Sequence, residues 1–382
     1  MGHMRTPAPE TIESITPCKR EIRDEYLKQH SFPWIIGFSG GKDSTIVVQL
    51  VIETILDIPP EQRRRPVFLL YNDTLVESPV FQDHVTARLK EISEGVQTLN
   101  LHIQVITTTP PLTESFWFNL LGKGYPAPNR SFRWCMDRLK ITPTSSFIRK
   151  HVEEFGQTIL LLGVRKSESI ARAIRIEKYS AEANYTRLVP NHEISGCSIF
   201  RPIIDLTTDQ VWDYIRNTVP PWGSSNLSLL ELYRDAGMCN ATQTCALMDE
   251  ETVPDSTSIL ARFGCWTCTV VRRDKSLETL VESGYPDLEF LVKFRERIRE
   301  VSDTPEHRSK MRRNGQPGLG PLTLEAREML LNELLEIQRR TGRNLISDHE
   351  VRLIREQWEL DKTELQIRTI RQQISSVSEV TQ

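Results

Sequence analysis

The chain has no apolar run that approaches the ~20 residues needed to cross a bilayer. It also begins without the apolar core of a signal peptide, and residues 1–4 resemble the remnant of a tag. We therefore expect a cytoplasmic protein that does not attach to a membrane. In that compartment its seven cysteines are more often metal ligands or reactive thiols than disulfide partners.

A strong net charge is also missing. The formal charge of −3 over 382 residues gives no global sign of a nucleic-acid-binding protein. Basic residues do cluster locally, at 63–65, 272–275 and 307–313. Each cluster alone is most simply solvated surface, although a local basic patch can also attract a phosphate backbone. A composition with 38% hydrophobic and 26% charged residues predicts a globular protein with a substantial core.

Two adjacent glycines lie between an apolar stretch and a helical pattern, in the run SGGKDST at 39–45. Glycines let the backbone approach a bulky anion, and the following helix directs its N–H groups and positive dipole end into the turn. The spacing excludes a Walker A loop, which needs four residues between its two glycines. We expect this turn to bind a polyphosphate. The residues proposed for that contact are Ser39, Gly40, Gly41, Lys42, Asp43, Ser44 and Thr45.

The first 230 residues alternate apolar runs with helical patterns. The candidate strands are 34–37, 67–71, 102–106, 159–163 and 199–204, and the candidate helices between them are 45–56, 80–95 and 143–155. This alternation predicts an α/β fold with a doubly wound, mostly parallel sheet. Ligands of such sheets bind at the carboxyl ends of the strands, where the glycine turn lies.

The remaining pattern suggests five segments. They are a tag and N-terminal extension (1–17), the α/β domain (18–235), a cysteine-rich segment (236–275), a helical C-terminal region (276–370) and a polar tail (371–382). The helical region carries a basic, glycine-rich loop at 307–320. We find no internal repeat.

Charged side chains follow several of the predicted strands. Asp73 and Glu77 come after the second strand, where a carboxylate can hold Mg²⁺ or orient a nucleotide, although a turn or a helix cap is an equal alternative. Arginine can make bidentate contacts with phosphate oxygens and stays charged throughout turnover. The arginines proposed to neutralise phosphate charge are Arg133, Arg138, Arg165 and Arg172.

At this point the sequence resembles a known family. Segments 39–45, 72–79, 133–143 and 163–173 resemble, in order, four blocks of the phosphoadenylylsulfate (PAPS) reductase family. Segment 202–212 resembles a further block, with Leu206 in place of a tryptophan. The resemblance implies an adenine nucleotide α-hydrolase-like fold and a PP-loop that cuts ATP between its α and β phosphates. Reductase activity is excluded, because no cysteine follows Cys268 and no two cysteines are adjacent.

The later segments 232–237, 264–271 and 312–316 resemble the DndC and SspD proteins of DNA phosphorothioation systems. That resemblance implies ATP-dependent sulfur insertion into the DNA backbone. The implied partners are DNA, a cysteine desulfurase as sulfur donor and other phosphorothioation proteins, and a homo-oligomer is possible. Arg312 and Arg313 are the residues proposed to contact DNA.

Four cysteines gather in the segment that lacks helical or strand periodicity. Their spacing is C-x5-C followed by C-x2-C, and four thiolates suit either zinc or an iron–sulfur cluster. The ligands proposed are Cys239, Cys245, Cys265 and Cys268, and the resemblance implies a [4Fe–4S] cluster with zinc as the alternative. Either Cys239 or Cys245 could instead be a buried structural cysteine. Cys135 lies between Arg133 and Arg138, which we expect to lower the pKa of its thiol; it could carry a persulfide, help to bind the cluster or pack.

The sequence therefore predicts an ATP pyrophosphatase and sulfurtransferase with ATP, Mg²⁺ and a metal centre as cofactors. Two alternatives stay open. The first is a tRNA thiolation enzyme, which uses the same adenylation on a base oxygen. The second is a binding module that senses a nucleotide without turnover.

Overall fold

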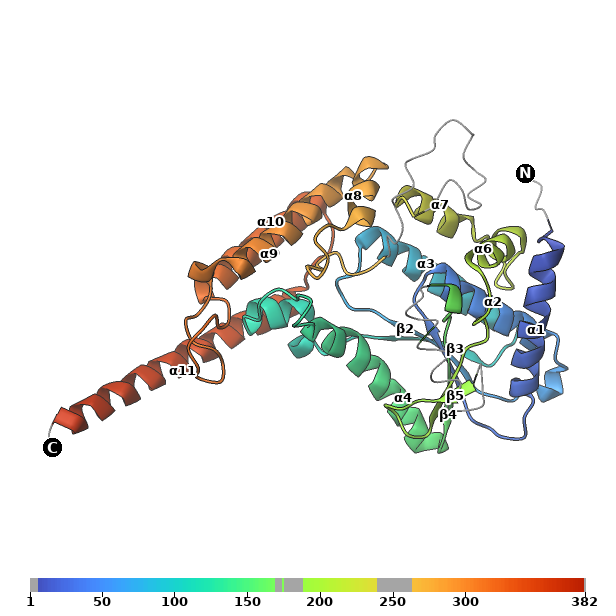
Figure 1. Ribbon diagram of the computed structural model, residues 1–382, viewed down its shortest axis with the longest axis horizontal. Coiled ribbons are helices and arrows are strands. Elements are labelled where there is room, and N and C mark those ends of the chain that lie inside the picture. Colours follow the sequence, from blue (N-terminus) through green and yellow to red (C-terminus); the bar gives the residue numbers. More distant parts are fainter. Residues whose placement is uncertain (1–5, 169–173, 175–187, 239–262, 381–382) are drawn as a thin grey trace.

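A computed structural model of the chain describes residues 6–168, 174, 188–238 and 263–380 (Figure 1). Three of the proposed site residues, Arg172, Cys239 and Cys245, lie outside the described residues. Within this described part, no helix combines the length and the apolar character needed to cross a bilayer.

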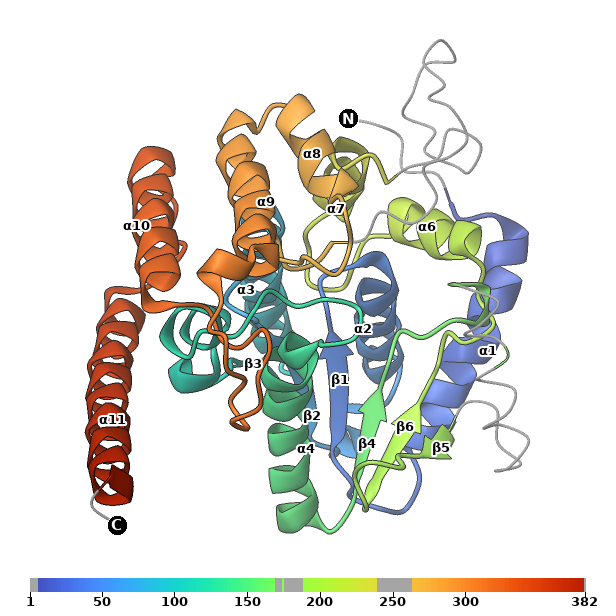
Figure 2. The same ribbon diagram turned by 60° about the vertical axis from the view of Figure 1, so that its left-hand side comes forward.

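The structure is organised around one six-stranded sheet (Figure 2). Its strands run in the order β3-β2-β1-β4-β6-β5. The first five in this order pair in parallel, and only the edge strand β5 is antiparallel to its neighbour. The bounds are β1 Trp34–Phe38, β2 Val67–Asn72, β3 Ile103–Thr108, β4 Thr158–Leu161, β5 Leu188–Pro190 and β6 Cys197–Phe200.

Helices cover both faces of the sheet, which confirms the doubly wound α/β fold. Along β1, Trp34 and Ile36 join the large core formed with α1 and α2, whereas Ile35 faces the second core, which Ile148 of α4 helps to fill. The helices of this half of the chain are α1 Pro9–Tyr26, α2 Lys42–Leu56, α3 Pro79–Thr98, α4 Thr142–Phe155, α6 Thr208–Asn217 and α7 Leu227–Asp235.

The C-terminal region is helical, as predicted, and packs on the α/β half of the molecule. Its helices are α8 Lys275–Glu282, α9 Glu289–Asp303, α10 Leu324–Thr341 and α11 Asp348–Val380. Two buried indole N–H groups tie it to the segment after β3. Trp117 Nε1 donates to the carbonyl of Leu345 at 2.8 Å, and Trp358 Nε1 donates to that of Leu121 at 2.7 Å.

Five strands and three helices predicted from periodicity are present, with ends shifted by a few residues. Three features differ from expectation. Helix α1 begins at Pro9, inside the proposed N-terminal extension, and buries Ile15 against the core. The short strand β5 carries no strong pattern and was not predicted. Helix α11 continues through the proposed tail to Val380, because that segment has no glycine or proline to end it.

Candidate active site

The glycine turn connects β1 to α2 at the carboxyl edge of the sheet (Figure 2). Gly40 has φ +77°, in the left-handed region that glycine adopts without strain, and an added Cβ would lie 2.2 Å from Cγ2 of Val85. Gly41 is the N-cap of α2. The predicted strand–turn–helix arrangement is therefore present, with the positive end of the α2 dipole at the turn.

Two hydroxyl groups hold this turn in shape. The hydroxyl of Ser44 accepts from the backbone N–H of Ser39 at 3.2 Å and donates to the carbonyl of Gly41 at 2.9 Å. The hydroxyl of Thr45 donates to the same carbonyl at 3.0 Å. Both side chains are buried, whereas Ser39 is exposed. Ser44 and Thr45 thus brace the loop from within, and the hydroxyl of the exposed Ser39 lies 3.2 Å from that of Ser44.

Asp43 connects the loop to the loop after β4. Its Oδ2 lies 3.0 Å from Nζ of Lys42, and its Oδ1 accepts from Nε of Arg165 at 2.7 Å. The side chain of Arg165 is almost fully buried, and its Nη1 donates to the hydroxyls of Ser167 and Thr208. Arg165 was proposed to contact phosphate. In the structure Arg165 instead holds the carboxylate of Asp43, and that carboxylate in turn positions the ammonium group of Lys42.

Tyr233 of α7 contacts the glycine turn, a role that the sequence analysis did not predict for it. Its hydroxyl accepts from the backbone N–H of Lys42 at 3.3 Å, and Nζ of Lys42 lies 5.8 Å from the centroid of its ring. The ring packs edge-on against Trp212 of α6. The residues 232–237 that carried part of the family resemblance therefore reach the glycine turn.

The two carboxylates after β2 have separate surroundings. Asp73 accepts from the backbone N–H of Leu75 and from the amide of Gln82, and burial raises the pKa of its carboxyl group. Glu77 was proposed to lie near a metal or a nucleotide. Its Oε1 receives hydrogen bonds from the hydroxyl of Thr74 at 3.0 Å and from the thiol of Cys265, a proposed metal ligand, at 3.7 Å.

Cys265 begins a segment that is bound to the end of β2. It forms an antiparallel bridge with Glu77, and Lys140 approaches the same carboxylate at 3.4 Å. Burial, followed by the charge of Glu77, raises the pKa of the Cys265 thiol to about 12. Cys268 interacts electrostatically with this thiol as well.

Cys135 also belongs to this group of thiols, and here the sequence-based expectation was wrong. Arg133 and Arg138 were expected to lower the pKa of its thiol. Burial raises that pKa instead, and the neighbouring thiol of Cys268 raises it further. Local sequence cannot show this, because the group that faces Cys135 is 133 residues away along the chain.

The metal centre is therefore only partly built from the described residues. Cys268 interacts electrostatically with both Cys135 and Cys265, but no three or more His, Cys, Asp or Glu side chains in the described ranges are gathered as ligands of one ion. The other two proposed ligands, Cys239 and Cys245, lie outside those ranges. Soft thiols are the right donors for zinc or a cluster, but the described set alone is incomplete.

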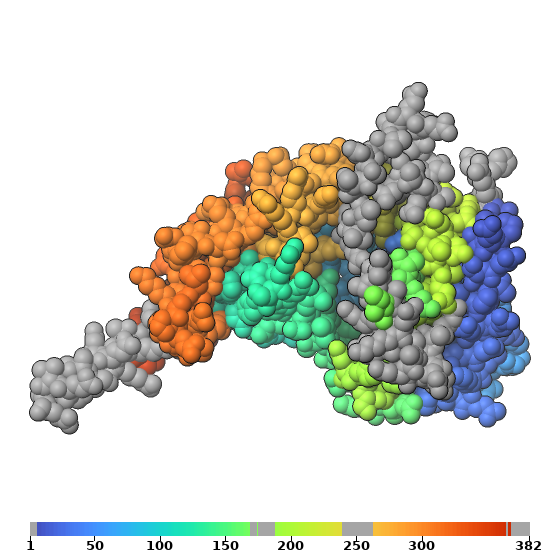
Figure 3. All heavy atoms as spheres, viewed as in Figure 1, coloured from blue at the N-terminus to red at the C-terminus, as the bar shows by residue number. Residues whose placement is uncertain are grey.

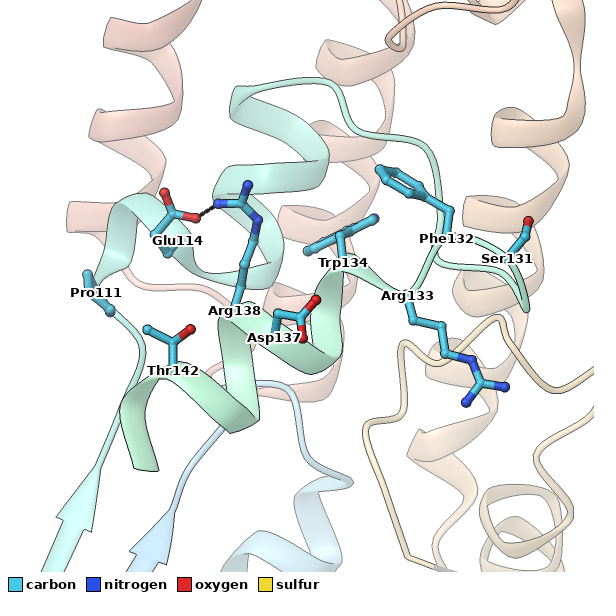
Figure 4. A pocket seen from close by; sticks show the side chains of 9 residues that line it. All are labelled: Pro111, Glu114, Ser131, Phe132, Arg133, Trp134, Asp137, Arg138 and Thr142. Atoms are coloured by element: carbon cyan, nitrogen blue, oxygen red, sulfur yellow. Dashed lines mark ion pairs between the residues drawn. The ribbon is translucent and has the colours of Figure 1, made fainter. Parts of the chain in front are cut away.

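The arginines of segment 133–138 line a cavity of about 670 Å³ next to the end of β3 (Figure 4). Arg138 forms an ion pair with Glu114, and its side chain points away from that of Arg133. Trp134 and Phe132 lie on the same wall as these arginines. Arg165, which was also proposed to neutralise phosphate charge, is not part of this cavity lining and contacts Asp43 instead.

The model of the phosphoadenosine phosphosulfate reductase domain matches residues 33–271, which is more than half of the chain. The chain belongs to the phosphoadenosine phosphosulfate reductase domain family. The match covers the sheet, the glycine turn, the arginine segments and the Cys265–Cys268 pair. This membership supports an enzyme that acts on nucleotides.

More specific relatives are distant. An uncharacterized protein of Methanocaldococcus jannaschii, MJ0066, is 25% identical over 203 residues, which are 53% of this chain. The aligned part spans about a third of that protein, 35% of its length. Two solved structures are similar at low TM-scores. A PAPS reductase from Candida auris has a TM-score of 0.35 and 16% identity, covering 59% of this chain and 94% of its own. The U34-tRNA thiolase NcsA from Methanococcus maripaludis has a TM-score of 0.32 and 15% identity. The match covers 78% of this chain and 89% of the thiolase chain.

Proposed function

We propose that the protein activates a phosphate group of the DNA backbone with ATP and exchanges one of its non-bridging oxygens for sulfur. The observation that carries the proposal is the co-location of two parts. The glycine turn, with Lys42 held by Asp43, and the thiols of Cys265 and Cys135 both lie at the carboxyl edge of one sheet. The glycine turn can bind the phosphates of ATP for adenylation, and the thiols can carry or transfer sulfur.

In the first step the turn holds the β and γ phosphates of ATP. The backbone N–H groups at the start of α2, the hydroxyl of Ser39 and the ammonium of Lys42 supply the positive field, and Mg²⁺ shares the phosphate charge. A non-bridging oxygen of the DNA phosphate attacks the α phosphorus. The bond between the α phosphorus and the bridging oxygen breaks, and pyrophosphate leaves with that oxygen.

In the second step a sulfide equivalent attacks the adenylylated DNA phosphorus. The new phosphorus–sulfur bond replaces the bond to AMP, which leaves with the former DNA oxygen. Adenylation is needed because oxide is too poor a leaving group, whereas AMP is a good one. A cysteine desulfurase is the proposed source of the sulfur, which it delivers as a persulfide. A thiol reductant such as excess cysteine then supplies the two electrons that release this sulfur as sulfide and is itself oxidised to a disulfide. The other phosphorothioation proteins are the proposed partners.

A [4Fe–4S] cluster or zinc is the proposed metal centre. Cys265 and Cys268 would hold it, with Cys135 and at least one of Cys239 and Cys245, and a bound cluster would supply a site for sulfur exchange. The described residues contribute to this centre without completing it. Lys140 and Glu77 form an ion pair beside Cys265.

The test is a reaction of the anaerobically purified protein with DNA, ATP, cysteine and a desulfurase. Nuclease digests are then analysed by mass spectrometry for phosphorothioate dinucleotides. We expect sulfur in DNA, with one AMP and one pyrophosphate formed for each sulfur inserted. Sulfur found only in added tRNA would favour the tRNA thiolation alternative, and ATP binding without pyrophosphate release would favour the binding module.

A further inference from the structure

The cavity of about 670 Å³ has the chemistry of a nucleobase site. The buried indole of Trp134 forms part of its wall, beside charged and hydroxyl side chains that can bond the edge of a base. Its lining is Pro111, Glu114, Ser131, Phe132, Arg133, Trp134, Asp137, Arg138 and Thr142 (Figure 4). Neither the glycine turn nor the thiols contribute to this lining, so the cavity is distinct from the part that binds ATP.

An aromatic side chain is exposed at the rim of this cavity. Phe132 is 43% exposed, although a phenylalanine normally buries most of its ring. The turn that carries it is rigid, because Oδ1 of Asn129 accepts from the backbone N–H groups of Ser131 and Phe132 at 3.0 and 2.9 Å. Arg130 and Arg133 flank it and are exposed. An exposed ring on a pre-ordered turn between two arginines is the arrangement that stacks a base and holds its phosphates.

The turn is also connected to the thiol segment. The hydroxyl of Thr269 donates to the carbonyl of Pro128 at 2.6 Å, and Thr269 directly follows Cys268. This bond connects the turn that carries Phe132 with the segment that carries Cys265 and Cys268.

A basic hairpin borders the same surface. Residues 308–322, predicted as a loop, form a hairpin with bridges at Arg308–Leu322 and Met311–Pro317. The segment has four basic side chains and no acidic one. It is bonded to the segment after β3, because the backbone N–H of Leu322 donates to the carbonyl of Gly124 at 2.7 Å. Figure 3 shows orange atoms of the C-terminal region beside teal atoms of the part of the chain that follows β3.

Tyr125 links the hairpin and the cavity. The guanidinium of Arg313 lies 4.7 Å from the centroid of its ring, and that of Arg138 lies 5.3 Å away. The ring in turn packs against Trp134 and Phe132. Of the two acids in the cavity lining, Glu114 is paired with Arg138 and with Lys123, and Asp137 is exposed between Arg133 and Arg138 in the sequence. The surface therefore presents positive charge and aromatic rings together.

We propose that this surface binds single-stranded DNA, with one base stacked on Phe132 and an adjacent base in the cavity. The arginines of the turn and of the hairpin hold the phosphates on either side. A duplex hides the faces of its bases within the stack, so an exposed ring and a concave pocket favour an unpaired strand. This inference rests on the proposed function, since it names the form of DNA that the same enzyme takes.

Fluorescence anisotropy with a labelled single-stranded oligonucleotide, in the absence of ATP, tests the base contact. We expect Phe132→Ala to weaken binding by about 5- to 150-fold, the range for removing one base–aromatic stack. Phe132→Tyr keeps an aromatic face and should bind like the wild type. Phe155→Ala is the matched control, since Phe155 is 36% exposed at the far end of α4 and should leave binding unchanged.

The salt dependence separates stacking from charge. Arg312→Gln with Arg313→Gln should reduce the slope of log affinity against log salt, by about 0.7 for each DNA phosphate that the protein no longer neutralises. Phe132→Ala should lower affinity without changing that slope. Unchanged affinity in Phe132→Ala, or equal affinity for single strand and duplex, would overturn the inference.

The two proposals can fail separately. Phosphorothioate formation that does not depend on Phe132 would count against the single-strand site and leave the proposed function intact. Single-strand binding that depends on Phe132, in a protein that inserts no sulfur, would support the site and count against the proposed function.

Discussion

Oδ1 of Asp43 accepts a hydrogen bond from Nε of Arg165 at 2.7 Å, although the two residues are 122 positions apart in the sequence. Asp43 stands in the first turn of α2 and Arg165 in the loop after β4, so the bond closes one side of the glycine turn. Gly163 allows this approach. A Cβ at that position would lie 2.5 Å from the carbonyl oxygen of Asp43.

Removing the buried guanidinium should destabilise the protein. Arg165→Met leaves the carboxylate of Asp43 without its buried partner, and we expect a loss of about 3 kcal/mol in the free energy of unfolding, measured in urea. Lys166→Met is the matched control, because its ion pair with Asp205 is exposed and should contribute less than about 1 kcal/mol. Equal losses in the two variants would contradict this role for Arg165.

The close approach at Gly163 gives a second prediction. Gly163→Ala should force the loops after β1 and β4 apart and lower the free energy of unfolding by about 2 kcal/mol. Pyrophosphate release should fall as well, because the loop that carries Lys42 is displaced. Gly264→Ala serves as control for stability, since a Cβ there meets no described atom within 4 Å. A Gly163→Ala variant with wild-type stability would show that the loops can separate at no cost.

The thiols predict a pattern of metal content. Cys265→Ser and Cys268→Ser should lose iron or zinc after anaerobic purification, and Cys135→Ser should lower the content because its thiol faces Cys268. Cys18→Ser should retain the metal, since Cys18 is buried within α1 and its thiol donates to the carbonyl of Ser14. Full metal content in Cys135→Ser would exclude it from the ligand set.

Glu350 predicts how stability depends on pH. Its carboxyl group is buried at the start of α11 and bonded to the hydroxyl of Ser115, and burial raises its pKa to about 7. The folded state therefore keeps a proton that the unfolded state releases at about pH 4.5. The contribution of Glu350 to the free energy of unfolding is fully present below about pH 4.5. It is lost as the pH rises to about 7, and the loss is up to roughly 3 kcal/mol.

Comparison of two variants isolates this contribution. Glu350→Gln should flatten the stability curve between about pH 4.5 and 7 and make the protein more stable than the wild type at pH 8. Glu356→Gln, an exposed position on the same helix, should leave the curve unchanged. Identical pH curves for wild type and Glu350→Gln would show that the carboxyl group does not hold its proton.

The sequence was most informative where one segment carries the whole signal. The glycine turn could be placed between strand and helix because the residues that form it are contiguous, and the buried parallel strands read as continuous apolar runs. Helix α1 was not predicted at all, and its first residues fall in the segment predicted as an N-terminal extension beside a tag. Strand β5 has three residues and no periodicity to detect.

The sequence indicated which residues belong to the candidate site better than it indicated which groups those residues contact. Arg165 was chosen because arginine suits phosphate, but which group it meets depends on how β4 packs beside β1. Glu77 was assigned to metal or nucleotide, and only the pairing of the β2 end with the distant segment at Cys265 shows its thiol partner. Tyr233 and Tyr125 were missed, because a tyrosine becomes a site residue only through such long-range contacts.

The most direct test of the central claim follows both products of the reaction in wild type and Lys42→Ala. With α-labelled ATP, DNA, a desulfurase and cysteine, the wild type should form AMP, pyrophosphate and phosphorothioate DNA in equal amounts. Lys42→Ala should lower all three together by about 10²- to 10³-fold, as expected when one charge that stabilises the transition state is removed. Lys90→Ala, which removes an exposed lysine of α3, should react like the wild type. Formation of ADP and inorganic phosphate, or sulfur insertion that persists without Lys42, would contradict the account.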